Sequence, residues 1–123
     1  MPHIVVDYSD PLSAAFDRRA FGLALHPLVA DLLEAPIDTC KTRFRRIEEA
    51  FIADGSPDQA MVHIELAILS GRTPEAKREL SRAVLDLARN HVPVPAGATL
   101  TLTVDVTELD RECYSKQVVT SLS

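Results

Sequence analysis

Residues 60–74 read AMVHIELAILSGRTP, and this stretch contains a strand, a turn and the start of a helix in direct succession. Apolar side chains occupy every second position of residues 60–69, as a half-buried β-strand requires. These alternating residues are Val62, Ile64, Leu66 and Ile68. We therefore expect a strand over residues 60–69, with a turn at residues 70–73.

The helix that follows this turn begins with three favourable residue types. Thr73 can cap its amino end, Pro74 suits the first helical position, and Glu75 complements the positive end of the helix dipole. An apolar stripe then runs to about His91, after which prolines and a glycine interrupt the pattern. The stripe consists of Leu80, Ala83, Val84, Leu87 and Ala88. We expect a helix over residues 74–91.

A second helix is expected earlier in the chain, over residues 12–34, which are rich in Ala and Leu. Asp10 and Pro11 form its predicted entry, as the cap and the first helical residue. Its predicted apolar face consists of Phe16, Leu23, Leu28 and Leu32. Pro27 removes a backbone hydrogen bond and clashes with the preceding turn, so we expect a kink or break there.

Three further strands complete the pattern. Residues 4–7, which begin with three apolar residues, indicate the first strand, and residues 39–47 indicate the second, with a broken continuation through residues 51–52 left open. Residues 99–106 alternate and indicate the last strand. Residues 110–123 are expected to form a short arm.

The resulting order is β-α-β, loop, β-α-β within a single domain of residues 1–123. Two right-handed crossovers place both helices on one side of the strands. We therefore predict an α+β fold (α/β sandwich) with a four-stranded mixed sheet and both helices on one face. The uncovered face would carry Met61, His63 and Leu69, which favours an oligomer.

Composition restricts the partners and the compartment. The 123-residue chain has a formal net charge of −5, which disfavours nucleic acid and membranes as partners. It shows no secretory signal pattern and no apolar run near the ~20 residues of a membrane span. Cys40 and Cys113 are the only cysteines, so we expect a reducing cytoplasm. The four histidines lack metal-ligand spacing, and no metal site is expected.

Pro2 heads the first predicted strand, directly after the initiator methionine. Excision of Met1 would expose Pro2 as a secondary amine held by its ring and by the sheet. A terminal amine titrates at about 7.7–8.0, and burial or nearby cations lower this pKa, so Pro2 could act as a general base near neutral pH. The alternative is a proline that merely begins a strand, where its missing N–H costs nothing.

Basic residues cluster in the second predicted strand of this acidic chain. The cluster consists of Lys41, Arg43, Arg45 and Arg46. Residues two apart share a strand face, so Lys41, Arg43 and Arg45 should point the same way. They would form either an anion-binding site or a solvated face with salt bridges to Glu48 and Glu49.

Arg72 is a second candidate ligand for an anion. It follows Gly71 in the turn between a strand and a capped helix, beside a helix amino end. The alternative is a solvated turn arginine. His63 lies between apolar residues and is interpreted as structural.

Five short segments together resemble one known family. They are Met1-Pro2-His3-Ile4-Val5-Val6, Ser9-Asp10, Ala53-Asp54-Gly55, Val62-His63-Ile64 and Gly71-Arg72-Thr73. Their order and approximate spacing resemble the 5-carboxymethyl-2-hydroxymuconate Δ-isomerases of the tautomerase superfamily. The resemblance covers roughly residues 2–92 and is weak beyond residue 93.

The resemblance implies a homotrimer of β-α-β repeats that isomerises enols to ketones without a cofactor. Pro2 would be the base, and the substrate an unsaturated 2-hydroxy di- or tricarboxylate from degradation of homoprotocatechuate-type aromatics. Arg72 would hold a carboxylate or stabilise the dienolate, and Lys41 and Arg43 would bind substrate. The family tends to have an Arg-x-Arg pair where this chain has Lys41-Thr42-Arg43, so the bidentate fork is lost at residue 41.

Two alternatives remain open at this point. One is a non-catalytic oligomeric module of the same fold that binds small carboxylates or a protein. The other is a different superfamily reaction, such as tautomerisation of a phenylpyruvate or hydration of a haloacrylate.

Overall fold

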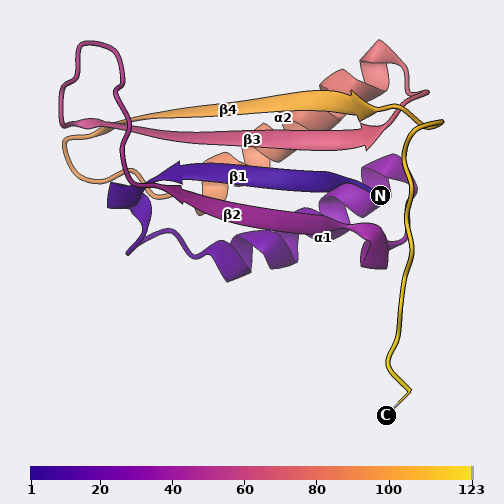
Figure 1. Cartoon of the computed structure of the whole chain (residues 1–123). Coiled ribbons are helices and arrows are strands. Elements are labelled where there is room, and N and C mark those ends of the chain that lie inside the picture. Colours follow the sequence, from indigo (N-terminus) through magenta and orange to yellow (C-terminus); the bar gives the residue numbers. More distant parts are fainter. Residues whose placement is uncertain (123) are drawn as a thin grey trace.

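The computed structural model describes residues 1–122 and has the predicted order of elements (Figure 1). The strands are β1 (His3–Ser9), β2 (Lys41–Ile47), β3 (Gln59–Leu69) and β4 (Thr99–Leu109). The helices are α1 (Arg18–Leu33) and α2 (Pro74–His91), with short 3-10 turns η1 (Asp10–Leu12) and η2 (Ile37–Thr39).

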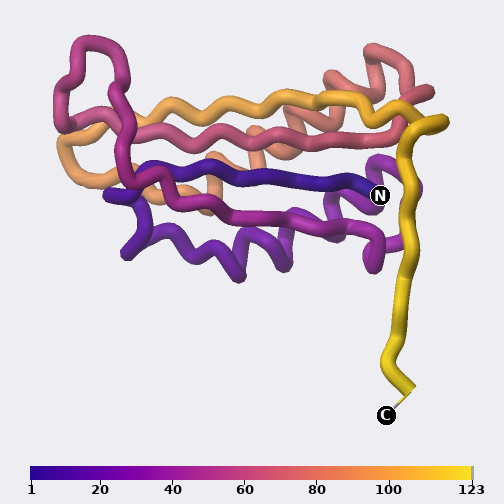
Figure 2. The backbone as a smooth tube through the Cα atoms, viewed as in Figure 1, coloured from indigo at the N-terminus to yellow at the C-terminus, as the bar shows by residue number. Residues whose placement is uncertain are grey.

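The four strands form one mixed sheet in the order β2-β1-β3-β4. β1 pairs in parallel with β2, β3 pairs in parallel with β4, and the central pair β1–β3 is antiparallel. Both helices lie on the same side of this sheet (Figures 1 and 2). The predicted α+β fold is confirmed.

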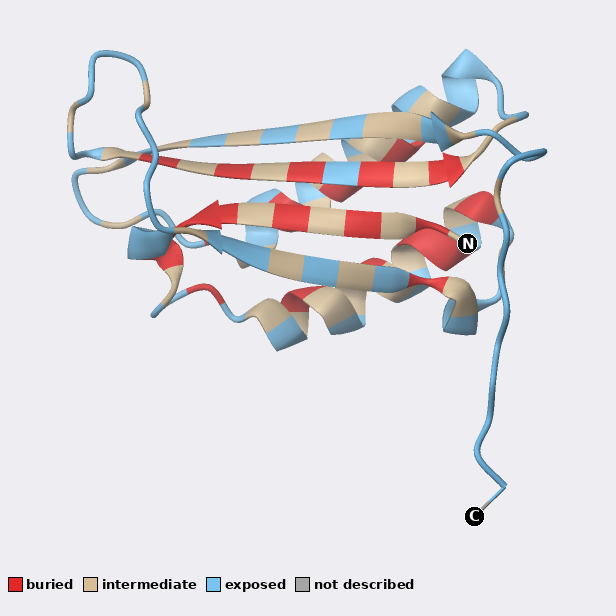
Figure 3. Cartoon of the chain, viewed as in Figure 1, coloured by how far each residue is buried: buried red, intermediate tan, exposed pale blue. Residues whose placement is uncertain are grey.

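The core lies between the sheet and the two helices, because alternate residues of every strand point to the helical side. The central strands β1 and β3 show the alternation most clearly, with buried and partly exposed residues following one another (Figure 3). The fully buried side chains include Ile4, Val6, Phe21, Leu25, Val62, Ile64, Leu66, Leu80 and Val84. The other side of the sheet, which we call the open face, carries the odd-numbered residues of the strands, including Met61, His63 and Leu69 as predicted.

Helix α1 begins later than predicted. Residues 10–12 form a 3-10 turn without a side-chain cap, and Asp17 caps α1 by accepting a hydrogen bond from the Ala20 backbone at 2.9 Å. The intervening segment turns Phe16 into the core, where it is 3% exposed. Tertiary burial therefore overrides the local entry signal at Asp10.

The helix does not break at Pro27, and its predicted apolar face is correct only in part: Leu32 packs against the core, whereas Leu23 does not. Leu23 is 64% exposed, and the core side of the helix consists of Phe21, Leu25, Val29, Ala30 and Leu33. Pro27 lies inside the continuous helix. An interior proline costs about 3 kcal/mol, and burying Leu25 and Val29 on either side contributes about 1.5–3 kcal/mol each, which offsets that cost.

Of the remaining boundaries, the start of α2 agrees with the prediction, whereas the extents of β2 and β4 differ from it. Thr73 caps α2 through a hydrogen bond from the Ala76 backbone, as expected. β2 starts at Lys41 because η2 precedes it, and it does not continue through residues 51–52; Phe51 is 83% exposed. β4 continues three residues beyond Val106, because it pairs with β3 as far as Leu69 and Leu109.

Residues 110–122 contain no helix or strand and run past the end of the sheet where the N-terminus lies (Figure 2). Tyr114 ties this segment to β1 through a 2.8 Å hydrogen bond between its hydroxyl and Nε2 of His3. Within residues 1–122, neither helix combines the length and the apolar character needed to cross a membrane.

We expect Asp17→Ala to lower the free energy of unfolding by about 1 kcal/mol, the usual cost of losing an N-cap. Urea unfolding measures the change. Asp31→Ala is the matched control, because this exposed carboxylate lies near the other end of α1 and should be neutral or slightly stabilising when removed. Equal stability of the two variants would contradict the assignment of the cap.

Candidate active site

A cavity of about 260 Å³ lies at one end of the sheet, where β1 begins and β3 ends. Its lining residues are Met1, Pro2, Leu33, Glu34, Ala35, Pro36, Thr39, Ile68, Leu69, Arg72 and Arg111. The antiparallel pairing places His3 opposite Ala67, so the amino end of β1 and the carboxyl end of β3 meet at this end of the sheet. Pro2 and Arg72, which lie 70 positions apart in the sequence, therefore share one cavity.

Pro2 is buried at the junction of β1 and β2, and its carbonyl accepts a hydrogen bond from the Lys41 backbone at 3.3 Å. In this structure Met1 precedes it and carries the terminal amine. Burial lowers the pKa of this amine, and the positive charges of Lys116 and Lys41 act in the same direction, whereas Cys40 and Asp38 oppose them. An amine at this end of β1 thus loses its proton more readily than an exposed one.

Arg72 is held over the cavity by the turn after β3. Gly71 has a φ of 118°, a conformation that glycine adopts without steric cost. The Arg72 guanidinium donates from Nη2 to the carbonyl of Leu33, the last residue of α1, at 2.6 Å. No carboxylate among residues 1–122 forms an ion pair with it. Its charge remains available to an anion.

Lys41 and Arg43 do not line this cavity. Their side chains belong to the open face, where β2 places them opposite His3 and Val5. Lys41 donates from Nζ to the carbonyl of Thr39 at 3.2 Å. The structure therefore brings Pro2 and Arg72 together, and it places Lys41 and Arg43 at the same end of the sheet but on its other side.

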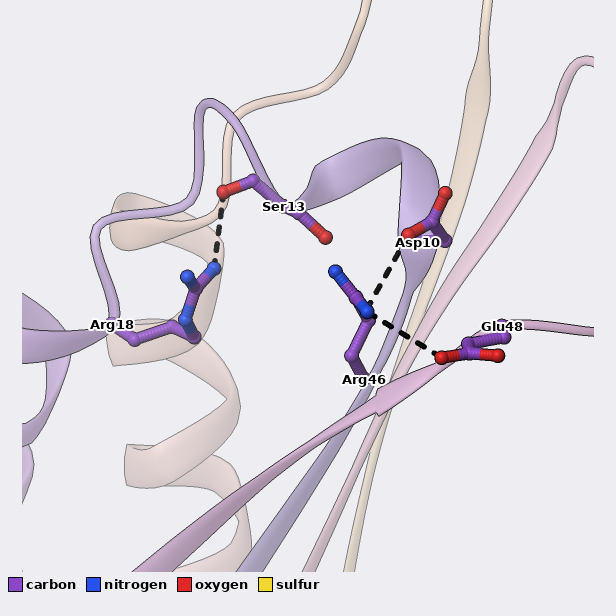
Figure 4. Close-up of polar contacts among 5 residues, drawn as sticks. All are labelled: Asp10, Ser13, Arg18, Arg46 and Glu48. Atoms are coloured by element: carbon purple, nitrogen blue, oxygen red, sulfur yellow. Dashed lines mark hydrogen bonds and ion pairs between the residues drawn. The ribbon is translucent and has the colours of Figure 1, made fainter.

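The other two cations of the basic cluster form salt bridges. Arg45 donates from Nε and Nη2 to the two carboxylate oxygens of Asp7, at 2.7 and 3.0 Å, and this contact raises the pKa of Arg45. Arg46 lies between Asp10 and Glu48, at 3.5 and 3.4 Å, at the far end of β2 (Figure 4). Arg45 therefore forms a salt bridge, but with Asp7 rather than with the predicted Glu48 or Glu49, and Glu48 pairs with Arg46 instead.

His3 and His63 both lie on the open face and contact hydroxyl groups. Nδ1 of His63 lies 2.6 Å from the hydroxyl of Thr103, in agreement with a structural role. His3 contacts Tyr114, and its buried Nδ1 has no hydrogen-bond partner within residues 1–122. Burial lowers the pKa of His3, and the charges of Arg43 and Lys41 lower it further.

Arg111 is a cavity residue that the sequence analysis missed. It lies two residues after β4, and because β4 pairs in parallel with β3, it lies at the same end of the sheet as Arg72. The apolar alternation of this strand could not have found it, because the next position in the pattern after Val106 is the charged Glu108. In the described part of the chain, no group of His, Cys, Asp and Glu is placed to hold a metal ion.

Comparison with known proteins gives a consistent result. The family model for 5-carboxymethyl-2-hydroxymuconate isomerase matches residues 2–120. The 5-carboxymethyl-2-hydroxymuconate Delta-isomerase of Escherichia coli is 26% identical over 118 residues, which cover 95% of this chain and 94% of the relative.

Solved structures show the same similarity. A 5-carboxymethyl-2-hydroxymuconate isomerase from Deinococcus radiodurans R1 superposes with a TM-score of 0.84 at 25% identity, covering 94% of this chain and 88% of that one. A member of the cis-3-chloroacrylic acid dehalogenase family superposes with a TM-score of 0.68 at 22% identity, covering 93% of this chain and 79% of that one. The second similarity concerns the fold alone.

We expect Arg43→Gln to raise the pKa of His3, because removing a nearby positive charge favours the protonated imidazole. NMR titration of the His3 ring measures the shift. Arg45→Gln is the matched control, because the charge of Arg45 is already opposed by Asp7. An unchanged His3 pKa in Arg43→Gln would show that Arg43 does not act on this part of the open face.

Proposed function

The chain belongs to the 5-carboxymethyl-2-hydroxymuconate isomerase family and is therefore an isomerase, and we propose that Pro2 is its general base. The proposed substrate is an unsaturated 2-hydroxy di- or tricarboxylate such as 5-carboxymethyl-2-hydroxymuconate. The observation that carries this proposal is the position of Pro2, buried on the wall of a cavity that also contains an unpaired arginine.

The proposed reaction moves one proton and needs no cofactor. After excision of Met1, the Pro2 nitrogen takes the proton of the substrate 2-hydroxyl, and the enol oxygen becomes a carbonyl. The electron pair moves along the conjugated system, and the Pro2 ammonium returns the proton to a distal carbon. Burial lowers the pKa of the Met1 amine, one residue before Pro2, and this supports the role, because a free base must be present near neutral pH.

Arg72 is proposed to hold a substrate carboxylate or to stabilise the dienolate that forms during proton transfer. Its hydrogen bond to Leu33 holds the guanidinium at the cavity wall, and the other N–H groups remain available for an anion. A fixed cation at the site of developing negative charge lowers the barrier without reorganisation during the reaction.

Lys41 and Arg43 are proposed to bind substrate carboxylates in an assembled homotrimer. Neither of them forms an ion pair within residues 1–122, yet both lie on the open face, away from the cavity of their own chain. They serve the site only if subunit contacts over the open face bring them to a cavity. We further propose that the single-domain enzyme acts in the cytoplasm in the degradation of homoprotocatechuate-type aromatics.

We expect the intact protein to be lighter than the full sequence by one methionine, and Pro2→Ala to reduce kcat/KM for ketonisation of 2-hydroxymuconate, because the primary amine that replaces the proline amine is not held by a ring. Alanine also permits removal of Met1, so this variant isolates the secondary amine. Pro93→Ala, at an exposed position after α2, is the control and should retain full activity. A fully active protein that keeps Met1 would contradict the proposal.

We expect sedimentation velocity to give a particle of three times the chain mass. The substitution Met61→Glu should dissociate this particle, because a charge would then be buried between subunits on the open face. A wild-type monomer with full activity would contradict the trimer and the proposed roles of Lys41 and Arg43 together.

A further inference from the structure

Arg111 is a second arginine on the wall of the Pro2 cavity, and it follows β4, whereas Arg72 follows β3. β3 and β4 are parallel and pair as far as Leu69 and Leu109, so both strands end at the same end of the sheet. Arg72 lies three residues beyond β3, and Arg111 lies two residues beyond β4. Two guanidinium groups thereby reach one cavity.

The structure holds Arg111 in place through Ser70. Its Nε and Nη2 atoms both donate to the Ser70 carbonyl, at 3.2 and 3.1 Å. Its backbone N–H donates to the Ser70 hydroxyl at 3.4 Å, and the Ser70 N–H donates to the Leu109 carbonyl at 3.0 Å. This arrangement leaves Nη1 without a hydrogen-bond partner among residues 1–122. A planar, fixed guanidinium loses little freedom when it binds an anion.

No carboxylate in the described chain neutralises Arg111. The adjacent Asp110 accepts hydrogen bonds from the Glu112 backbone and the Cys113 thiol, so its oxygens are directed into their own turn. Glu34 also lines the cavity, but it is exposed and forms no ion pair with Arg72 or Arg111. The cavity wall therefore carries two unpaired arginines and apolar surface, which includes Leu33, Ile68 and Leu69.

We propose that Arg111 binds a second carboxylate of the ligand, so that the cavity selects dicarboxylates over monocarboxylates. This inference rests on the proposed function in taking the Pro2 cavity as the substrate site. Arg72 holds one carboxylate, Arg111 holds the other, and the apolar wall contacts the carbon chain. Arg111 is thus a specificity-determining residue.

The test uses two ligands of the same length that have no enol to isomerise. They are trans,trans-muconate, with a carboxylate at each end, and sorbate, with a carboxylate at one end and a methyl group at the other. Isothermal titration calorimetry of the full-length protein gives both Kd values. We expect Arg111→Gln to weaken muconate binding about tenfold or more and to leave sorbate binding within about twofold, because only muconate has a second charge to lose.

The controls separate recognition from structure. Arg82→Gln removes an exposed arginine of α2 and should change neither Kd. Arg111→Lys should recover part of the muconate affinity, since charge is kept while the bidentate fork is lost. An Arg111→Gln variant that loses both ligands equally, or neither, would overturn the proposal.

Because these ligands are not isomerised, the measurement does not depend on turnover. An inert wild-type enzyme with the predicted difference in Kd would reject the proposed reaction and keep the role of Arg111. An active enzyme in which Arg111→Gln does not change the two Kd values differently would keep the proposed reaction and reject the role of Arg111.

Discussion

The antiparallel pairing of β1 with β3 is the constraint on which the candidate site depends. It sets the first residues of the chain against the carboxyl end of β3, with His3 opposite Ala67. The parallel pairing of β3 with β4 then places the segment after β4 at the same end of the sheet. If β1 ran parallel to β3, Pro2 would lie a full strand length from Arg72, and the cavity would lose either its amine or its cations.

The distribution of paired and unpaired charge separates structural cations from candidate ligand-binding ones. Arg45 and Arg46 neutralise carboxylates at positions away from the cavity. Arg72 and Arg111 are instead held by backbone carbonyls, which fix a guanidinium without cancelling its charge. A carbonyl anchor suits an anion site, because it orients the cation and leaves it to the ligand.

Local patterns predicted much of the fold. The alternation of residues 60–69 and the Thr73-Pro74 helix start depend on neighbours in sequence, and the structure has both. The start of α1 depends on the burial of Phe16, and the end of β4 depends on pairing with β3, so neither could be predicted from local signals. The early predicted end of β4 in turn hid Arg111.

The site was predicted only in part, because it too depends on pairing between strands that are far apart in the sequence. The period of two correctly placed Lys41 and Arg43 on one strand face. Whether that face meets the cavity depends on the register between β1 and β2, in which Lys41 lies opposite His3 rather than Pro2. A sequence pattern specifies faces within a strand, and only pairing between strands specifies which faces coincide.

The most direct measurement is a ¹⁵N NMR titration of the protein labelled with ¹⁵N-proline. We predict that one of the eight prolines behaves as a free secondary amine with a pKa below the about 7.7–8.0 of an ordinary terminal amine, and that Lys41→Met raises this pKa, because Lys41 lowers the pKa of the neighbouring Met1 amine. Eight amide signals that do not change with pH, or an amine that titrates at or above 8.0, would contradict the central claim that the buried start of β1 supplies the base.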